Sequence, residues 1–469
     1  MVKEVSDVVP NPPLWRQLKH WVGMDRAILF TVCARFWSSG AGVITVLLIA
    51  RFLTPTERGY YYTFSSLVAL QVIFELGFSF VVLQLAAHER AQLTFLPDGR
   101  VEGDAVAHSR LASILQKAVR WYFVAGILMT AVLLPVGFMF FGAKQNLHTD
   151  VAWGVPWCLL VIASMLAFQI DPVFSFLEGC GYITDVARRR FVQAIIGSIL
   201  AWIALFTHHG LYAPAMIILG QVAVGAAMIL SSSLSTLLKG LYCHTSVRDR
   251  VDWRTEILPF QWRIAVSWLC GYFIYQIFSP ILFRFQGPTA AGQMGMSVQI
   301  SSAISGVALS WINTKASPFG SLIARKDYTA LDKLFFRAAW QSWAIYWIGA
   351  LMFLLVLIYG GPDFPKLAKC VLEPWSFALL LVSTSIGHAS ACQALYLRAH
   401  KREPFLWVTI VSSILIATST LALAPKFGVN GVIVGTCIIS VLYGLPAGTF
   451  VFISKRRQWH DPNLCDSTT

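Results

Sequence analysis

Long apolar segments alternate with short polar connectors along almost the whole 469-residue chain. An apolar run of about 20 residues can cross ~30 Å of hydrocarbon as a helix that rises about 1.5 Å per residue. Runs of this length lie near residues 27–50, 62–86, 119–141, 153–178, 191–207, 211–238, 259–283, 291–313, 335–358, 374–398, 404–424 and 430–453. The pattern predicts an all-α polytopic membrane protein with about 12 transmembrane helices.

The positively charged residues are concentrated in every second connector. When residues within three positions of a span end are counted with the adjoining connector, the N-terminal segment, every second connector and the C-terminal tail hold 27 of the 36 Lys and Arg residues. The opposite connectors hold 7, and Arg35 and Arg263 lie deeper inside spans. Connectors rich in Lys and Arg face the cytoplasm. We therefore expect a cytoplasmic N-terminal segment (1–26), a cytoplasmic tail (454–469) and a cytoplasmic position for Arg189, which the span boundaries assign to a connector.

The composition narrows the class of protein. With 57% hydrophobic and 13% charged residues, the chain is too apolar for a soluble domain of this length. The net charge of +13 does not indicate nucleic-acid binding, because the basic residues lie in connectors and form no basic domain. The nine cysteines are scattered without a CxxC pair, and the pair His208-His209 is typical of a solvated turn, so we expect neither a metal site nor a cofactor.

A short motif occurs twice. Residues 51–59 (RFLTPTERG) and 284–292 (RFQGPTAAG) share the pattern RFxxPTxxG, and each copy follows the first span of a set of six. An even number of spans per unit makes the units parallel repeats, related by an axis along the membrane normal. We predict two six-helix bundles, 27–238 and 259–453, joined by the cytoplasmic linker 239–258, with a central cavity between them.

The first hairpin also resembles a known family. The segments FLTP (52–55), GYYYTFSSL (59–67) and LQVIFELG (70–77) are similar to the opening hairpin of bacterial O-antigen and polysaccharide flippases. These flippases belong to the multidrug/oligosaccharidyl-lipid/polysaccharide exporter superfamily. The close match covers about 50 residues, and the twelve-span plan extends it less specifically.

The resemblance implies a function and a location. It implies that the protein moves an undecaprenyl-pyrophosphate-linked oligosaccharide from the cytoplasmic to the periplasmic leaflet of the bacterial inner membrane. A polysaccharide polymerase and chain-length machinery are the partners that it suggests, besides the lipid bilayer. The cavity residues of the family vary widely, so the resemblance does not identify the glycan.

Four ionisable residues lie inside predicted spans, where an unpaired charge costs at least ~2.5–3.5 kcal/mol. They are Arg35, Glu75, Asp171 and Arg263, all in the cytoplasmic half. Arginine donates paired hydrogen bonds to phosphate oxygens, so Arg35 and Arg263, one from each bundle, are predicted to clamp a pyrophosphate. The polar residues that share their helical faces complete the predicted substrate site: Ser38, Ser39 and Gln71.

Other roles remain open for these residues. Arg35 and Glu75 can form a structural pair, and Arg263 can extend to the membrane surface. Glu75 and Asp171 are candidates for coupling to a proton or sodium gradient, although a carboxylate beside Pro172 can instead satisfy backbone donors that the proline frees. The lone His388 favours a hydrogen-bonded packing role.

Two further classes of protein remain as alternatives. A cation-coupled multidrug antiporter of the same superfamily would favour an acidic cavity, whereas this chain supplies two arginines. A membrane polysaccharide polymerase or glycosyltransferase would need a sizeable external loop for catalysis, and the predicted external connectors are all short. The sequence therefore favours a transporter and not an enzyme.

Overall fold

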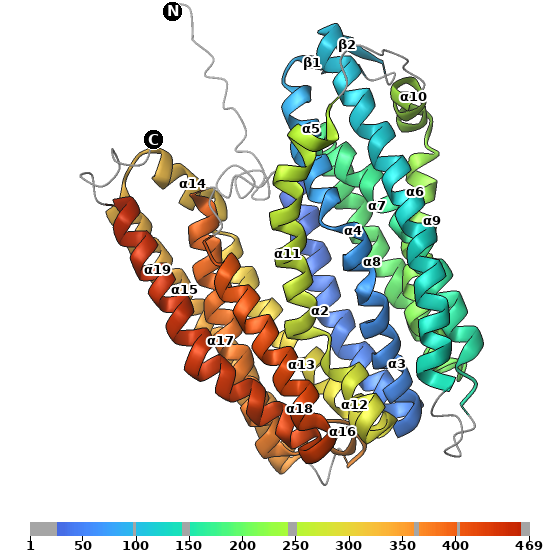
Figure 1. Ribbon diagram of the computed structural model, residues 1–469, viewed down its shortest axis with the longest axis vertical. Helices are drawn as coiled ribbons and strands as arrows, with labels where there is room; N and C mark the ends of the chain where they lie inside the picture. Colours follow the sequence, from blue (N-terminus) through green and yellow to red (C-terminus); the bar gives the residue numbers. More distant parts are fainter. Residues whose placement is uncertain are drawn as a thin grey trace, which may run out of the picture.

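The computed structural model describes residues 26–96, 100–142, 151–242, 251–360, 365–400 and 404–460, and this part of the chain is almost entirely helical (Figure 1). The N lobe comprises α2 (Arg26–Phe52), α3 (Pro55–Val68), η1 (Ala69–Gln71), α4 (Val72–Glu75), α5 (Phe78–Arg90), α6 (Ala105–Gly142), α7 (Gly154–Gly179), α8 (Ile183–Phe206), η2 (Gly210–Tyr212), α9 (Ala213–Ile229) and α10 (Ser232–Tyr242). Between α5 and α6, β1 (Leu93–Phe95) and β2 (Val101–Gly103) form a short antiparallel hairpin.

The second half of the chain forms the C lobe. After η3 (Trp253–Ile257) it comprises α11 (Leu258–Tyr275), α12 (Phe278–Gln286), α13 (Pro288–Asn313), α14 (Ala316–Ala324), α15 (Tyr328–Tyr359), α16 (Pro365–Cys370), α17 (Pro374–Ala399), α18 (Leu406–Ile439), η4 (Ser440–Gly444) and α19 (Leu445–His460). The two lobes meet at one end of the molecule, near α3, α12 and α16, and diverge toward the other (Figure 1). We call these the closed end and the open end; α2 begins and α19 ends at the open end.

The helices account for the predicted number of spans. Among the described residues, 9 helices are long and apolar enough to cross a membrane, or 11 when each of two bent pairs counts as one span. The last of them runs for 55 residues, Leu406–His460, which would extend about 80 Å as one straight helix. It breaks at Gly428, whose φ of 60° and ψ of −145° are not helical. Counting two spans there gives the twelve that the hydrophobic pattern predicts.

Two spans bend near the middle of the molecule. The second breaks by 45° between α4 and α5, at Leu76 and Gly77, whose φ values are 50° and 65°. Glycine adopts this left-handed conformation readily, whereas leucine rarely does. A Cβ atom on Gly77 would lie 2.4 Å from Cγ2 of Ile264, so the break lets α11 of the C lobe pack directly on the second span. The seventh span bends by 40° between α11 and α12.

The repeated motif builds the starts of α3 and α13. Thr54 and Glu57 form a capping box at α3, because the Thr54 hydroxyl accepts from the Glu57 backbone N–H at 3.2 Å and the Glu57 carboxylate accepts from the Thr54 N–H at 2.8 Å. Pro55 and Pro288 occupy the first helical position, where a missing N–H costs nothing. In the second copy, Gly287 precedes the helix with a φ of 91°. The motif is thus a helix start in both lobes.

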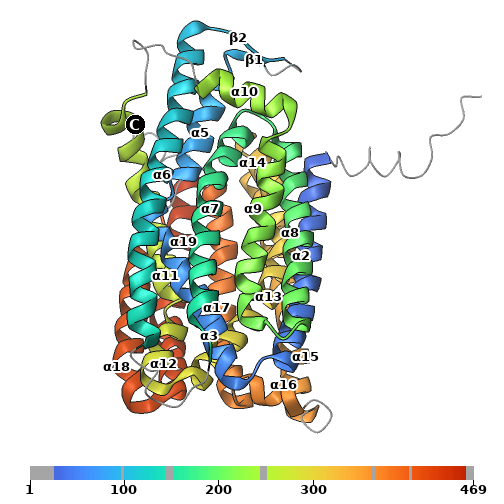
Figure 2. The same cartoon turned by 90° about the vertical axis from the view of Figure 1, so that its right-hand side faces the viewer.

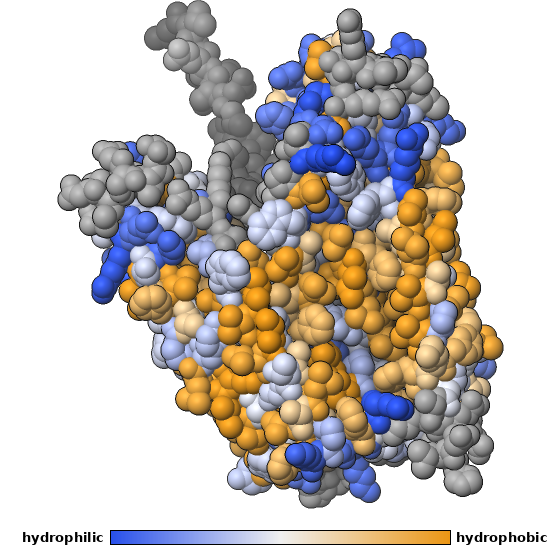
Figure 3. Space-filling model, viewed as in Figure 1, coloured by the Kyte–Doolittle hydropathy of each residue, from blue (hydrophilic) through white to orange (hydrophobic). Residues whose placement is uncertain are grey.

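Apolar residues cover the middle of the face shown in Figure 3, and hydrophilic residues gather toward both ends of that face. Large apolar side chains such as Phe36, Met139 and Phe450 have 73–76% of their area exposed. A soluble protein rarely exposes so much apolar area, whereas hydrocarbon lipid covers it at no cost. The protein is therefore a multi-pass membrane protein.

Several helix boundaries differ from the prediction, among them those of the fifth and sixth spans. The sixth span ends at Ile229, earlier than predicted, and α10 crosses the open end as a separate amphipathic helix (Figure 2), burying Leu234, Leu237 and Leu241. The fifth span begins at Ile183, eight residues earlier than predicted, because its first two turns are helical although they are too polar for hydrocarbon. Residues 188–190 therefore lie inside α8 and not in a connector.

The described part of the linker is attached to the N lobe. The Trp253 ring stacks on Trp121 of α6 with centroids 5.0 Å apart, and the Val251 N–H donates to the Ser113 hydroxyl at 3.1 Å. Residues 243–250 lie outside the described part of the chain. The boundaries of the two predicted bundles remain a prediction.

Candidate functional site between the lobes

The lobes touch at the closed end through glycines of the repeated motif. A Cβ atom on Gly59 would lie 2.0 Å from the carbonyl oxygen of Pro288, and one on Gly292 would lie 2.9 Å from the backbone nitrogen of Gly59. No larger residue fits at these positions, because real Cβ atoms do not approach so closely. The two copies of the motif therefore pack backbone against backbone and seal this end. Tyr60 and Phe283 extend the seal, with ring centroids 5.0 Å apart.

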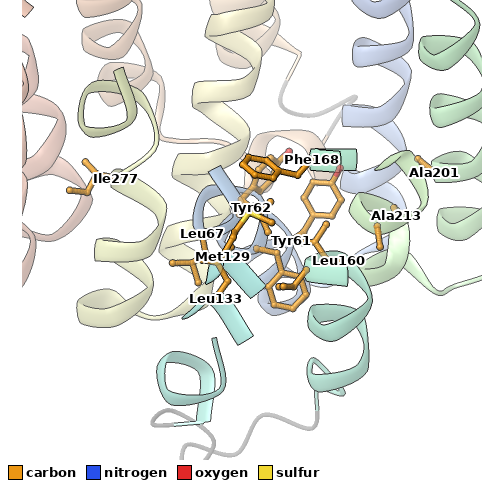
Figure 4. Close-up of a cluster of buried hydrophobic side chains, with 14 of the residues drawn as sticks. Tyr61, Tyr62, Leu67, Met129, Leu133, Leu160, Phe168, Ala201, Ala213 and Ile277 are labelled. Atoms are coloured by element: carbon orange, nitrogen blue, oxygen red, sulfur yellow. The ribbon is translucent and has the colours of Figure 1, made fainter. Parts of the chain in front are cut away.

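A cavity of about 310 Å³ lies next to this seal, between the two lobes. We call it the apex cavity. Residues of α3, the bent seventh span and α13 line it: Tyr61, Tyr62, Ser65, Ser66, Tyr275, Gln276, Phe278, Ser279, Gly295, Val298, Gln299 and Ser302. Figure 4 shows Tyr61 and Tyr62 among buried side chains of the N lobe, including Leu67, Met129 and Leu160. The lining combines hydroxyl, amide and aromatic groups and carries no charged side chain.

Two hydrogen bonds cross between the lobes at the apex cavity. The Tyr62 hydroxyl donates to Oε1 of Gln299 at 2.7 Å, and the Ser66 hydroxyl donates to Oε1 of Gln276 at a longer 3.5 Å. None of these four residues is among those predicted from the sequence, because Tyr, Ser and Gln in apolar spans resemble ordinary packing residues. Their common location depends on the bend in the seventh span, which the hydrophobic pattern does not show.

Arg35 lies on α2, toward the open end, with an exposed side chain. The indole of Trp37 donates to the Ala194 carbonyl on α8 at 3.2 Å. Residues two apart lie about 200° apart around a helix, so Arg35 points away from α8. Ser38 is exposed and Ser39 half-buried, and the Ser39 hydroxyl donates to the Arg35 carbonyl at 2.9 Å. Within the described residues, no carboxylate lies within ion-pair distance of the Arg35 guanidinium.

Glu75 lies at the end of α4, immediately before the break in the second span. Its Oε1 accepts from the Ser79 hydroxyl at 2.5 Å and from the Tyr122 hydroxyl at 3.3 Å. The structural pair with Arg35 that the sequence left open is not formed among the described residues. Gln71, one turn before Glu75, is half-buried in η1.

Asp171 forms an ion pair with Arg189. The hydrophobic pattern wrongly places this arginine in a connector between two spans. Nη2 of Arg189 lies 3.3 Å from Oδ1 of Asp171, and the guanidinium stacks 3.3 Å from the ring centre of Phe174. The Arg189 side chain is only 5% exposed, whereas that of Asp171 is 64% exposed. The expected position of Arg189 in a connector is therefore wrong, since α8 begins eight residues before the apolar run and carries Arg189 into the lobe, whereas its location on the cytoplasmic side remains a prediction.

Arg263 lies on α11, and its side chain is outside the described part of the structure. Both its proposed role beside a pyrophosphate and its alternative extension to the membrane surface remain predictions. The same holds for a role of Ser38, Ser39 and Gln71 in binding substrate.

His388 has hydrogen-bond partners on two neighbouring helices. Nδ1 lies 3.2 Å from the Ser305 hydroxyl and Nε2 lies 3.0 Å from the Ser342 hydroxyl. Because the Ser342 hydroxyl donates to the Ala308 carbonyl at 2.7 Å, its oxygen must accept from Nε2–H, and Nδ1 then accepts from Ser305. A neutral His388 thus satisfies α13, α15 and α17 together, in agreement with the predicted packing role.

No three His, Cys, Asp or Glu side chains in the described residues come together as a metal site. The two lobes of membrane-spanning helices meet at one end and enclose an uncharged polar cavity there. The chain belongs to the polysaccharide biosynthesis protein family, whose sequence profile matches residues 26–319.

Solved structures share the fold along nearly the whole chain. The MATE multidrug transporter DinF-BH, solved as a ligand complex, matches with a TM-score of 0.59 and 15% identity, over 97% of this chain and 99% of that chain. The lipid II flippase MurJ in an inward closed conformation matches with a TM-score of 0.54 and 13% identity, over 92% and 90%. An inward-facing MATE family transporter of the MOP superfamily gives a TM-score of 0.54 and 13% identity, over 91% and 99%. No protein of curated function matches the sequence.

Proposed function

We propose that the protein flips an undecaprenyl-pyrophosphate-linked oligosaccharide from the cytoplasmic to the periplasmic leaflet of a bacterial inner membrane. Membership of a polysaccharide biosynthesis family and the fold shared with the lipid II flippase MurJ support this substrate class. The proposal includes no enzymatic step. A polysaccharide polymerase and chain-length machinery are the partners expected downstream.

The uneven distribution of Lys and Arg among the connectors supports an assignment of the side of the membrane from which the substrate enters. With both termini in the cytoplasm, the open end of the molecule faces the cytoplasm and the glycine seal faces the periplasm. The lobes then rock about the closed end, so that Gly59 and Pro288 separate while the open end closes. The attachment of Trp253 to Trp121 means that the linker moves with the N lobe.

The exposed guanidinium of Arg35 is the main observation that supports the proposal. A charge that faced lipid would cost at least ~2.5–3.5 kcal/mol, so a side chain that points away from α8 is best placed toward water between the lobes. Arginine without a carboxylate partner is suited to hold a pyrophosphate through paired N–H donors. Ser38 and Ser39 lie next to it and add hydroxyl donors.

Glu75 and Asp171 support coupling to a proton or sodium gradient. The two carboxylates interact electrostatically, and the side chain of Asp171 is 64% exposed. This acidic pair also favours the second candidate function, a cation-coupled antiporter of the same superfamily. Arg189 offsets one of the two negative charges, which makes the N lobe less suited to a cationic drug.

Export of surface polysaccharide tests the proposal in a strain that lacks its own flippase. The Arg35→Gln variant should insert normally and lose at least about tenfold in export per membrane-inserted protein. Arg35→Lys should recover part of the activity, because lysine keeps the charge but lacks the paired donors. Polysaccharide at the cell surface, quantified with an antibody or lectin and normalised to protein in the membrane, is the measurement.

Arg120→Gln is the matched control, since Arg120 is an exposed arginine of α6 at the periphery of the N lobe. It should export normally. Wild-type export by Arg35→Gln would remove Arg35 from the substrate site. If the wild-type protein instead failed to restore export and expelled a cationic dye from vesicles, the antiporter function would replace the proposal.

A further inference from the structure

We propose that the apex cavity binds the sugar part of the transported molecule, and that the sugar hydroxyls replace the two hydrogen bonds that join the lobes there. This inference rests on the proposed function and extends it. It assigns separate places to the two chemical parts of the substrate, the pyrophosphate beside Arg35 and the uncharged sugar at the closed end of the space between the lobes.

The chemistry of the lining favours an uncharged, hydroxyl-rich ligand. The cavity presents tyrosine and serine hydroxyls and the amides of Gln276 and Gln299, and none of its lining residues is charged. Hydroxyl and amide groups both donate and accept, as the hydroxyls of a sugar do. The tyrosine rings supply flat apolar faces against which a sugar ring can pack. A pyrophosphate or a cation would find no counter-charge here and would lose its hydration.

The size and position of the cavity suit the end of a long ligand. A volume of about 310 Å³ lies at the lower end of the range of ligand pockets, ~300–1,000 Å³, so it accepts a terminal sugar and not a whole oligosaccharide. The glycine seal of Gly59 and Gly292 ends the space immediately beyond it. A sugar that entered from the open end would stop at this point.

The cross-lobe hydrogen bonds connect binding with the motion of the lobes. The Tyr62–Gln299 bond of 2.7 Å and the longer Ser66–Gln276 bond join α3 to the C lobe. When the lobes separate at the closed end, both bonds must break, and buried polar groups left without partners are unfavourable. A bound sugar offers replacement partners to the same groups. The loaded cavity therefore opens more readily than the empty one.

The absence of a side chain at Gly295 makes room for Tyr62 at the boundary between the lobes. A Cβ atom at this position would lie 2.4 Å from Cβ of Tyr62, so only glycine lets the Tyr62 side chain lie across the boundary between the lobes and reach Gln299. The arrangement places one hydroxyl donor of the N lobe and one amide of the C lobe at the same point. Such a site discriminates strongly against ligands without hydroxyls, because its polar groups would then be left unpaired.

Binding of four synthetic probes to the purified full-length protein in lipid nanodiscs tests the inference. One probe is decyl pyrophosphate, and the other three carry glucose, galactose or N-acetylglucosamine on that pyrophosphate. Calorimetric titration should show that at least one sugar probe binds about tenfold more tightly than decyl pyrophosphate. Tyr62→Phe and Gln299→Met should reduce this gain to less than about threefold and leave the Kd of decyl pyrophosphate unchanged.

Tyr346→Phe is the matched control, because Tyr346 is a buried tyrosine whose hydroxyl donates to the Leu381 carbonyl within the C lobe. It should retain the full gain. If Tyr62→Phe fails to fold, Ser66→Ala removes the second cross-lobe bond and should also reduce the gain.

The outcomes separate the two proposals. Equal binding of all four probes to the wild-type protein, or an undiminished gain in the Tyr62→Phe/Gln299→Met double variant, would overturn the inference and leave the proposed function standing. Failure of the wild-type protein to bind any of the four probes would contradict the proposed function, and the inference with it.

Discussion

The two lobes carry polar networks on equivalent helices but with different chemistry. In the N lobe, Glu75, Tyr122 and Asp171 lie on the second, third and fourth spans. In the C lobe, Ser305, Ser342 and His388 lie on the second, third and fourth spans of that lobe, and they form a closed set of neutral hydrogen bonds.

The difference shows which parts of the repeat share a structural role. The helix starts and glycines of the RFxxPTxxG motif have the same role in both lobes, because both copies build the seal. The interiors have diverged, since the network of the N lobe includes the carboxylates of Glu75 and Asp171, whereas the network of the C lobe consists of serine hydroxyls and the imidazole of His388. The difference in charge thus concerns these two networks, since the C lobe also holds the ion pair of Asp332 and Arg456.

The largest effect on stability is expected at the charged network. Asp171→Asn leaves the Arg189 guanidinium buried without its carboxylate, which should lower the free energy of unfolding by about 3 kcal/mol, the low end for such a change because Asp171 is largely exposed. The Asp171→Asn/Arg189→Met double variant removes both charges and should recover most of the loss. Thermal unfolding in detergent, followed by tryptophan fluorescence, is the measurement.

The neighbouring pair Arg190–Glu178 provides the matched control. Its atoms lie 2.6 Å apart, but the Arg190 side chain is 58% exposed. Arg190→Met should therefore cost less than about 1 kcal/mol. A double variant at Asp171 and Arg189 that is less stable than Asp171→Asn alone would show that Arg189 stabilises the lobe through packing on Phe174 and not through the charge pair.

A smaller effect is expected at the neutral network. His388→Leu leaves the Ser305 hydroxyl without its acceptor and removes a donor from Ser342, which should cost about 1–3 kcal/mol. His388→Gln, which keeps a donor and an acceptor, should cost less. His209→Leu in an exposed turn is the control and should change the unfolding temperature little. Loss of transport at normal stability in His388→Gln would mean that His388 takes part in transport and does not serve packing alone.

The smallest effect concerns a surface pair at the open end. The hydrogen bond from the Arg110 guanidinium holds the pKa of Glu256 below its usual value of 4.5. A lowered carboxyl pKa adds stability above pH 4.5, and this contribution disappears as the pH falls through the lowered value. Glu256→Gln should therefore be less stable than wild type by about 0.5 kcal/mol at about pH 7 and equally stable at low pH. A difference that grew toward acid pH would contradict this assignment.

Features that depend on local composition could be predicted from the order of residues alone. Twelve spans follow from the lengths of the apolar runs, because each run must satisfy its own backbone within the hydrocarbon. The RFxxPTxxG motif marked the equivalent points of the two lobes, since a proline at a helix start acts locally. The positions of Arg35, Glu75 and Asp171 within predicted spans could also be identified from the sequence, because charged residues are rare in apolar runs.

The partners of the polar side chains, in contrast, follow from how the helices pack. Glu75 contacts Ser79 and Tyr122, and not Arg35, because the second span breaks at Leu76 and Gly77 and redirects its polar face. Arg189 enters the N lobe because α8 continues beyond its apolar run, and no hydrophobic scale marks the polar end of a helix. The apex cavity likewise depends on the bend in the seventh span and on helices far apart in the sequence. Helix rotation and bending depend on packing against neighbours, so side-chain partners between helices do not follow from the order of residues alone.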